Sequence, residues 1–126
     1  MKFKILPYLE ILRPISGIFG SLIVLIGFSI VIGKDNFVPY FQIRGNLIKL
    51  ILAMFLYFFL VGAGNTINDV LDYDIDKVNR PKRPLVRGAI KPRVAIYYYI
   101  YLILIIISLA IIGASLSPNS TFIPLL

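Results

Sequence analysis

Carboxylate and amide side chains crowd into one short stretch of this sequence, directly after a long apolar run. Four of the six acidic residues fall between positions 69 and 76. The members of the stretch are Asn65, Asn68, Asp69, Asp72, Asp74 and Asp76. Ionised groups beside hydrocarbon are costly unless they are paired, hydrated or metal-bound, and oxygen ligands suit hard cations such as Mg²⁺, Mn²⁺ or Ca²⁺. The stretch therefore predicts a metal-binding site.

The spacing of these residues predicts that most of them share one helix face. A helix turns by 100° per residue, so side chains three or four positions apart lie together. If the apolar helix continues through the stretch, an arc of roughly 60° holds Asn65, Asp69, Asp72 and Asp76, with Asn68 beside it. Carboxylates this close repel each other unless divalent cations bind them. Because protein-bound Mg²⁺ usually completes its shell with water and substrate phosphates, the pattern also predicts a phosphorylated ligand.

A basic segment follows the carboxylates at once. Seven of the thirteen basic residues lie between positions 77 and 93, and three prolines and a glycine there predict a loop rather than one helix. The bases that could clamp the free oxygens of a metal-bound diphosphate are Arg80, Lys82, Arg83, Arg87 and Lys91. A second interpretation stays open, in which they are only the positively charged flank of a membrane span.

Composition places the chain among membrane proteins. Of its 126 residues, 59% are apolar or aromatic and 15% are charged. Cysteine and histidine are both absent, which excludes disulfides, thiolate or imidazole metal ligands and a Ser-His-Asp triad. The net charge of +7 does not predict nucleic-acid binding, because the bases lie beside apolar spans instead of in a soluble domain.

Three long apolar segments predict the elements that hold the acidic stretch in place. Residues 14–33 carry no charge over twenty positions, which as a helix cover about 30 Å, the thickness of a hydrocarbon core. Residues 47–68 and 94–115 form the second and third expected spans. The fold class is thus an all-α membrane protein, and the acidic stretch lies at the mouth of its second span.

The remaining segments are expected to be connections. Residues 1–13 suit a short helix at the membrane surface or the frayed start of the first span, and residues 34–46 predict a loop. The sequence Ser117-Pro-Asn-Ser120 predicts a turn, after which residues 121–126 would open a fourth span, so the chain looks cut off. The positive-inside rule places the basic loop 77–93 and the N-terminus in the cytoplasm of a multi-pass cell-membrane protein.

At this point the motif resembles a known family. The pattern Asn68-Asp69-x-x-Asp72-x-x-x-Asp76, followed by Asn79-Arg-Pro-Lys-Arg-Pro and Gly88, resembles the first aspartate-rich motif and the following loop of UbiA-type intramembrane prenyltransferases. Leu12-Arg13-Pro14 is similar to the family's entry into its first helix. The resemblance covers essentially the whole chain as one N-terminal part, residues 1–126, of a UbiA-type domain.

The resemblance implies a fold and a reaction. The fold would be a nine-helix bundle around a lipid-accessible cavity, whose C-terminal helices and second aspartate-rich motif would complete the site, because nothing acidic follows Asp76 here. The reaction would be Mg²⁺-dependent transfer of a prenyl group from a prenyl diphosphate. By the resemblance, the residues that would bind Mg²⁺ are Asn68, Asp69, Asp72 and Asp76. Those that would bind the substrate are Asn65, Asn68, Arg80, Lys82 and Arg83.

The acceptor is the most open part of this interpretation. The residue pattern of the motif most resembles that of the archaeal branch of the family, which adds a second geranylgeranyl chain to geranylgeranylglyceryl phosphate in ether-lipid synthesis. Aromatic acceptors, as in quinone, haem or chlorophyll-type synthesis, are the alternative. A third possibility is a membrane protein that binds cations or anionic lipid and catalyses nothing. The chain by itself, without further helices, is expected to be inactive.

Overall fold

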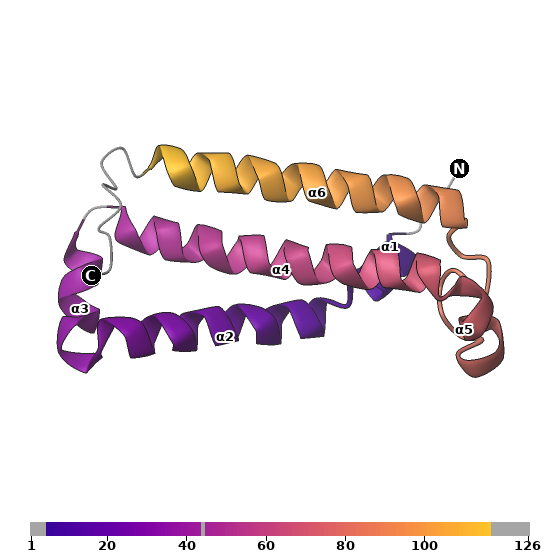
Figure 1. The fold of residues 1–126 in the computed structure, drawn as a ribbon, viewed down its shortest axis with the longest axis horizontal. Helices are drawn as coiled ribbons and strands as arrows, with labels where there is room; N and C mark the ends of the chain where they lie inside the picture. The colour runs from indigo at the N-terminus through magenta and orange to yellow at the C-terminus, as the bar shows by residue number, and fades with distance from the viewer. Residues whose placement is uncertain (1–4, 44, 117–126) are drawn as a thin grey trace, which may run out of the picture.

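The computed structural model describes residues 5–43 and 45–116, and in those ranges it is built of helices and connecting turns without strands. Three long helices run side by side: α2 (Pro14–Ile32), α4 (Asn46–Leu71) and α6 (Pro92–Ser115) (Figure 1). Each is long and apolar enough to cross a membrane. The predicted all-helical membrane fold with three spans is therefore confirmed. The expected turn and fourth span after residue 116 lie outside the described residues.

Helix α4 lies between the other two long helices and packs against both of them (Figure 1). Glycines on α2 allow the close approach, since a Cβ added at Gly17 would lie only 2.6 Å from the ring of Phe58 on α4. One turn further along α2, Ser21 Oγ donates a hydrogen bond to the carbonyl oxygen of Met54 on α4 at 2.9 Å. Small residues are the usual means by which membrane helices pack closely.

The connection between the first two spans differs from its prediction. Residues 34–46 were expected to be a loop, but the segment contains a helix, α3 (Lys34–Gln42), despite its internal Pro39. Its aromatic side chains stand at helical spacing and pack on α2, with Tyr40 and Phe28 in an edge-to-face pair whose ring centroids are 4.9 Å apart. This packing outweighs the loss of one backbone hydrogen bond at the proline.

The other end of the bundle carries two short helices (Figure 1). Helix α1 (Leu6–Leu12) precedes α2 and is separated from it by Arg13, which has a left-handed backbone with φ of 52°. After α4 ends at Leu71, a second short helix, α5 (Tyr73–Asn79), begins at once. Turns then carry the chain from residue 80 to Pro92, the first residue of α6, and they include most of the predicted basic loop.

Candidate functional site

Two buried carboxylates and two arginines meet at the end of the bundle where α4 passes into α5. Asp69 lies on the last turns of α4 and Asp76 lies on α5. Arg13 comes from the junction of α1 and α2, and Arg83 comes from the loop after α5. Side chains from four separate segments thus build one charged cluster, which we call the Asp–Arg cluster.

Asp69 is the most buried member of the Asp–Arg cluster, with a side chain that is only 3% exposed. Its Oδ1 accepts a hydrogen bond from Arg13 Nη2 at 2.5 Å and lies 3.0 Å from Arg83 Nη1. Arg13 also reaches the amide one turn earlier on α4, where its Nη1 donates to Asn65 Oδ1 at 3.4 Å. Asn65 and Asp69 therefore face the start of α2 together, as their spacing of four residues requires.

Asp76 is buried as well, and it shares an arginine with Asp69. Its side chain is 6% exposed, and its Oδ2 accepts a hydrogen bond from the same Nη1 of Arg83 that approaches Asp69. One guanidinium thus bridges two carboxylates. Buried carboxylates are tolerated where such charge-assisted hydrogen bonds compensate for lost hydration, and removal of either partner would leave an unpaired buried charge.

The loop that carries Arg83 is fixed by packing. Leu85 and Ile90 are almost fully buried and form an apolar cluster with Ile11 of α1 and Ala95 of α6. Arg87 in the same loop donates from its Nη2 to Glu10 Oε2 at 2.7 Å, which ties the loop to α1 a second time. The loop therefore holds Arg83 against the carboxylates instead of leaving it to sample solvent.

The helix break at Asp72 interrupts the continuous helix on which the predicted face of three carboxylates depends. That prediction required one continuous helix, but Asp72 lies between the end of α4 and the start of α5, and its side chain is exposed. In the described ranges, no group of three or more acidic side chains is close enough to share a metal ion. Asp69 and Asp76 come together through Arg83, whereas Asp72 lies outside their cluster.

Three other predicted site residues are also on the surface. Asn68, Arg80 and Lys82 are exposed. Asp74, expected to be solvated, is exposed and accepts a hydrogen bond from Lys77 Nζ at 2.7 Å. That hydrogen bond raises the pKa of the Lys77 ammonium above its ordinary value. Of the cations predicted to serve the site, only Arg83 is in contact with the buried carboxylates in the part of the chain that the structure describes.

Arg13 is the site residue that the sequence analysis missed. It appeared only within the family-like Leu12-Arg13-Pro14, and its partner Asp69 is 56 positions away. A signal was present, because Arg13 is a lone charge at the mouth of an uncharged span, and such residues usually have a partner. Its left-handed φ is uncommon for a residue other than glycine and adds a second mark of a functional position.

The donor atoms of the cluster fit a hard cation that arrives with a phosphate ligand. Mg²⁺ is commonly held by one or two carboxylates together with water and substrate phosphates, and Asp69 and Asp76 supply two. Asn65 supplies a further observation, because its Nδ2 is buried and has no hydrogen-bond partner among the described residues. An unsatisfied buried N–H group suits an acceptor oxygen, such as that of a phosphate.

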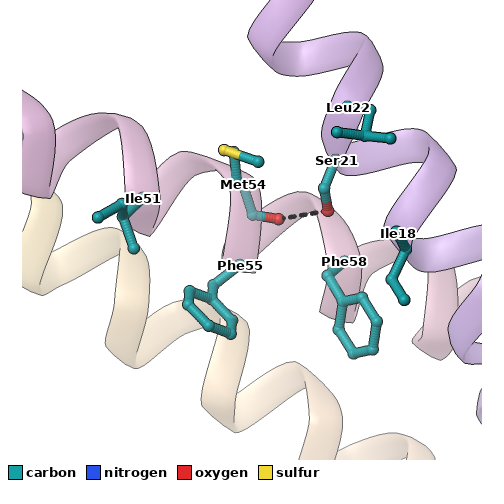
Figure 2. A pocket seen from close by; sticks show the side chains of 7 residues that line it. All are labelled: Ile18, Ser21, Leu22, Ile51, Met54, Phe55 and Phe58. Atoms are coloured by element: carbon teal, nitrogen blue, oxygen red, sulfur yellow. Dashed lines mark hydrogen bonds between the residues drawn. The ribbon is translucent and has the colours of Figure 1, made fainter.

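An apolar cavity of about 320 Å³ lies between α2 and α4, away from the Asp–Arg cluster. Figure 2 shows Phe55 and Phe58 projecting from α4 near Ile18 of α2, beside the hydrogen bond from Ser21 to the carbonyl of Met54. The full lining is Ile18, Ser21, Leu22, Ile51, Met54, Phe55 and Phe58. The lining carries no charged side chain, so the cavity suits an apolar chain and not the phosphate itself.

Comparison with known proteins gives a consistent family. The model of the UbiA prenyltransferase family matches residues 40–126. A protein named digeranylgeranylglyceryl phosphate synthase from Thermococcus sibiricus is 42% identical over 96 residues, which are 75% of this chain and 31% of the relative. Proteins of the same name from Pyrococcus horikoshii and Methanosphaera stadtmanae are 41% and 37% identical, over 81% and 84% of this chain and 34% and 35% of their own lengths.

The chain therefore spans about a third of the length of these curated relatives. No solved structure matches the chain significantly. The match begins within the first connection and includes α4, α5 and α6, so it contains Asp69, Asp76 and Arg83. The matches to the three relatives extend over 96 to 106 residues, which is longer than the range 40–126 of the family model, so they include residues before position 40.

Proposed function

Because the chain belongs to the UbiA prenyltransferase family and is an integral membrane protein, we propose that the complete gene product transfers a prenyl group from a prenyl diphosphate to a lipid acceptor. The observation that carries the proposal is the pair of buried carboxylates bridged by Arg83 at the end of a membrane-spanning helix. The names of the relatives support geranylgeranylglyceryl phosphate as acceptor and geranylgeranyl diphosphate as donor. The allylic C–O bond to diphosphate would break, and the acceptor hydroxyl would lose its proton and form an ether.

Members of this family generally depend on a divalent metal, and we propose Mg²⁺ here. Asp69 and Asp76 would hold it from the buried side, and the exposed Asp72 and Asn68 stand at the adjoining helix break. Bound Mg²⁺ would stabilise the negative charge that develops on the departing diphosphate. One N-terminal part of a UbiA-type domain, residues 1–126, would contribute this half of the site, and helices that follow in the relatives would contribute the other half.

The protein's own cations would act on the same leaving group. Arg83 and Arg13 carry guanidinium groups suited to phosphate oxygens, and the free Nδ2 of Asn65 would donate one more hydrogen bond. Arg80 and Lys82 are exposed beside the cluster and would attract the anionic substrate before it docks. The prenyl chain would occupy the cavity between α2 and α4, since Phe58 lies about 10 Å along α4 from Asn65 at a helical rise of about 1.5 Å per residue.

We also propose that the end of the bundle with the Asp–Arg cluster faces the cytoplasm, together with the N-terminus. The basic loop at that end supports this orientation by the positive-inside rule. A prenyl diphosphate is charged and would approach from the aqueous cytoplasm, while its chain enters the membrane. The test introduces single cysteines at Lys82 and Lys34 and treats intact cells with a membrane-impermeant reagent. We expect labelling at position 34 and not at position 82; labelling at position 82 would show the opposite orientation.

The function is tested by assaying membranes that contain the complete gene product. We expect radiolabelled geranylgeranyl diphosphate to be joined to geranylgeranylglyceryl phosphate in the presence of Mg²⁺, and not after chelation. Transfer to an aromatic acceptor instead would keep the family activity but replace the acceptor. Absence of transfer to any acceptor, with the protein correctly inserted, would favour a non-catalytic role in binding cations or anionic lipid.

A further inference from the structure

The two buried carboxylates of the Asp–Arg cluster are neutralised by cations that the chain itself supplies. Asp69 Oδ1 lies 2.5 Å from Arg13 Nη2 and 3.0 Å from Arg83 Nη1, and Asp76 Oδ2 accepts from that same Arg83 nitrogen. The carboxylates are 3% and 6% exposed. A divalent cation that approaches these oxygens therefore competes with guanidinium groups already in contact with them.

The charge balance of the cluster opposes a metal ion that binds alone. Two arginines and two aspartates sum to no net charge, so a divalent cation would leave the buried cluster with excess positive charge. It would also displace at least one guanidinium, and an unpaired charge in a buried site is costly. A neutral, fully paired cluster is thus a poor site for Mg²⁺ by itself, although its carboxylates are suitable ligands.

A diphosphate that accompanies the cation removes both obstacles. Diphosphate carries more negative charge than one divalent cation carries positive, so the pair brings no excess positive charge into the cluster. Its oxygens also offer new partners to the displaced guanidinium groups, which bind phosphate in a bidentate manner. Arg83 suits this exchange, because a guanidinium has five N–H donors, more than its contacts through Nη1 use.

We propose that Arg83 and Arg13 close the buried carboxylates to a divalent cation alone, and that the site opens only when the cation arrives with a diphosphate group, which takes over the two guanidinium groups. This inference rests on the proposed function and adds an order of binding to it. The consequence is that the site does not load metal in the absence of substrate. Arg83 and Arg13 then block the metal site until diphosphate binds, and they also bind the phosphate.

The test measures binding by the unfolding temperature of the purified complete gene product, followed by circular dichroism. The additions are magnesium chloride alone, sodium diphosphate alone, and both together. We expect little shift with magnesium alone and a clear rise with both, because a ligand stabilises only the state that binds it. The apparent affinity for Mg²⁺ should be at least about tenfold higher when diphosphate is saturating.

Variants separate gating from simple metal binding. Arg83→Gln should raise the affinity for magnesium alone, since it leaves the carboxylates with net negative charge, and should lower the joint affinity. Arg93→Gln removes an exposed cation on α6 and is the matched control, expected to behave as the unmodified protein. If Arg83→Gln does not fold, Arg13→Gln, which removes one of the two guanidinium contacts of Asp69, should show the same changes to a smaller degree.

The outcomes distinguish this inference from the proposed function. Equal affinity for magnesium with and without diphosphate, in a protein that still transfers prenyl groups, would overturn the gating and leave the enzyme assignment intact. Unchanged magnesium affinity in both arginine variants would overturn it too. Cooperative binding of magnesium and diphosphate in a protein that transfers nothing to any acceptor would support the gating while refuting the proposed reaction.

Discussion

The two ends of the helical bundle are held together by different kinds of contact. At one end α3 folds back on α2 through aromatic pairs, such as Tyr40 of α3 with Phe28 of α2 at a centroid distance of 4.9 Å (Figure 1). At the other end the chain buries Asp69 and Asp76 with Arg83 between them. Aromatic and amide contacts suffice to close the α3 end, where Asn46 Nδ2 simply donates to the carbonyl of Tyr40 at 2.9 Å.

This difference supports the proposal that the charged end binds a ligand. Buried ion pairs add little net stability, because desolvation offsets most of their attraction. A bundle that needed only to close its helix ends could do so as the α3 end does. Within the described ranges, the α3 end has no such charged cluster, and its backbone positions of positive φ are glycines, Gly33 and Gly45, whereas Arg13 is not a glycine. Substitutions at the charged end should therefore affect both turnover and stability, and those at the α3 end stability alone.

The largest effect is expected from Asp69→Ala. The change removes the shared partner of Arg13 and Arg83 and should destabilise the protein by about 3–5 kcal/mol, as loss of one member of a buried pair does. Prenyl transfer by the complete gene product should be abolished, while insertion into the membrane continues. Turnover and unfolding temperature measure the two effects separately, and a variant that keeps normal turnover would refute the role of Asp69.

A smaller effect, on stability alone, is expected from Phe41→Ala at the α3 end. The side chain packs at the edge of two neighbouring rings, those of Phe37 and Tyr40. Its loss should lower the free energy of unfolding by about 1–2 kcal/mol and leave the turnover per folded molecule unchanged. Phe55→Ala, also a removal of a phenyl ring but in the cavity, is the matched comparison. A fall in turnover with Phe41→Ala would contradict the division between the two ends.

The sequence predicts the long helices well and the site only in part. Uncharged length decides a membrane span, so α2, α4 and α6 follow from the composition of three segments. The break at Asp72 does not, because the angle between α4 and α5 is set by tertiary contacts such as that of Arg83 with Asp76. Helical arithmetic assumes a straight helix and therefore placed Asp72 beside Asp69.

Long-range pairing explains the other omissions. Arg13 meets Asp69 across 56 positions, and no local pattern connects them. The helix α3 was missed for a related reason, since Pro39 argues locally against a helix whereas the contact of Tyr40 with Phe28 on α2 favours one. The residue types in the local sequence indicate which chemistry is possible. The fold determined which of those residues meet.

The smallest effect is expected from Asp74→Asn, close to the Asp–Arg cluster in sequence but on the exposed side of α5. Asp74 is paired only with Lys77, and both side chains are largely in water, so turnover and unfolding temperature should not change measurably. The pKa of Lys77, raised by the hydrogen bond to Asp74, should fall in the variant, which the pH titration of its side-chain NMR signal measures. In the unmodified protein the pair's contribution is complete below the unfolded-state pKa of Lys77 and is lost as pH rises through the folded-state pKa. Loss of turnover in Asp74→Asn would mean that function depends on the whole acidic run, and not on the two carboxylates that the fold buries.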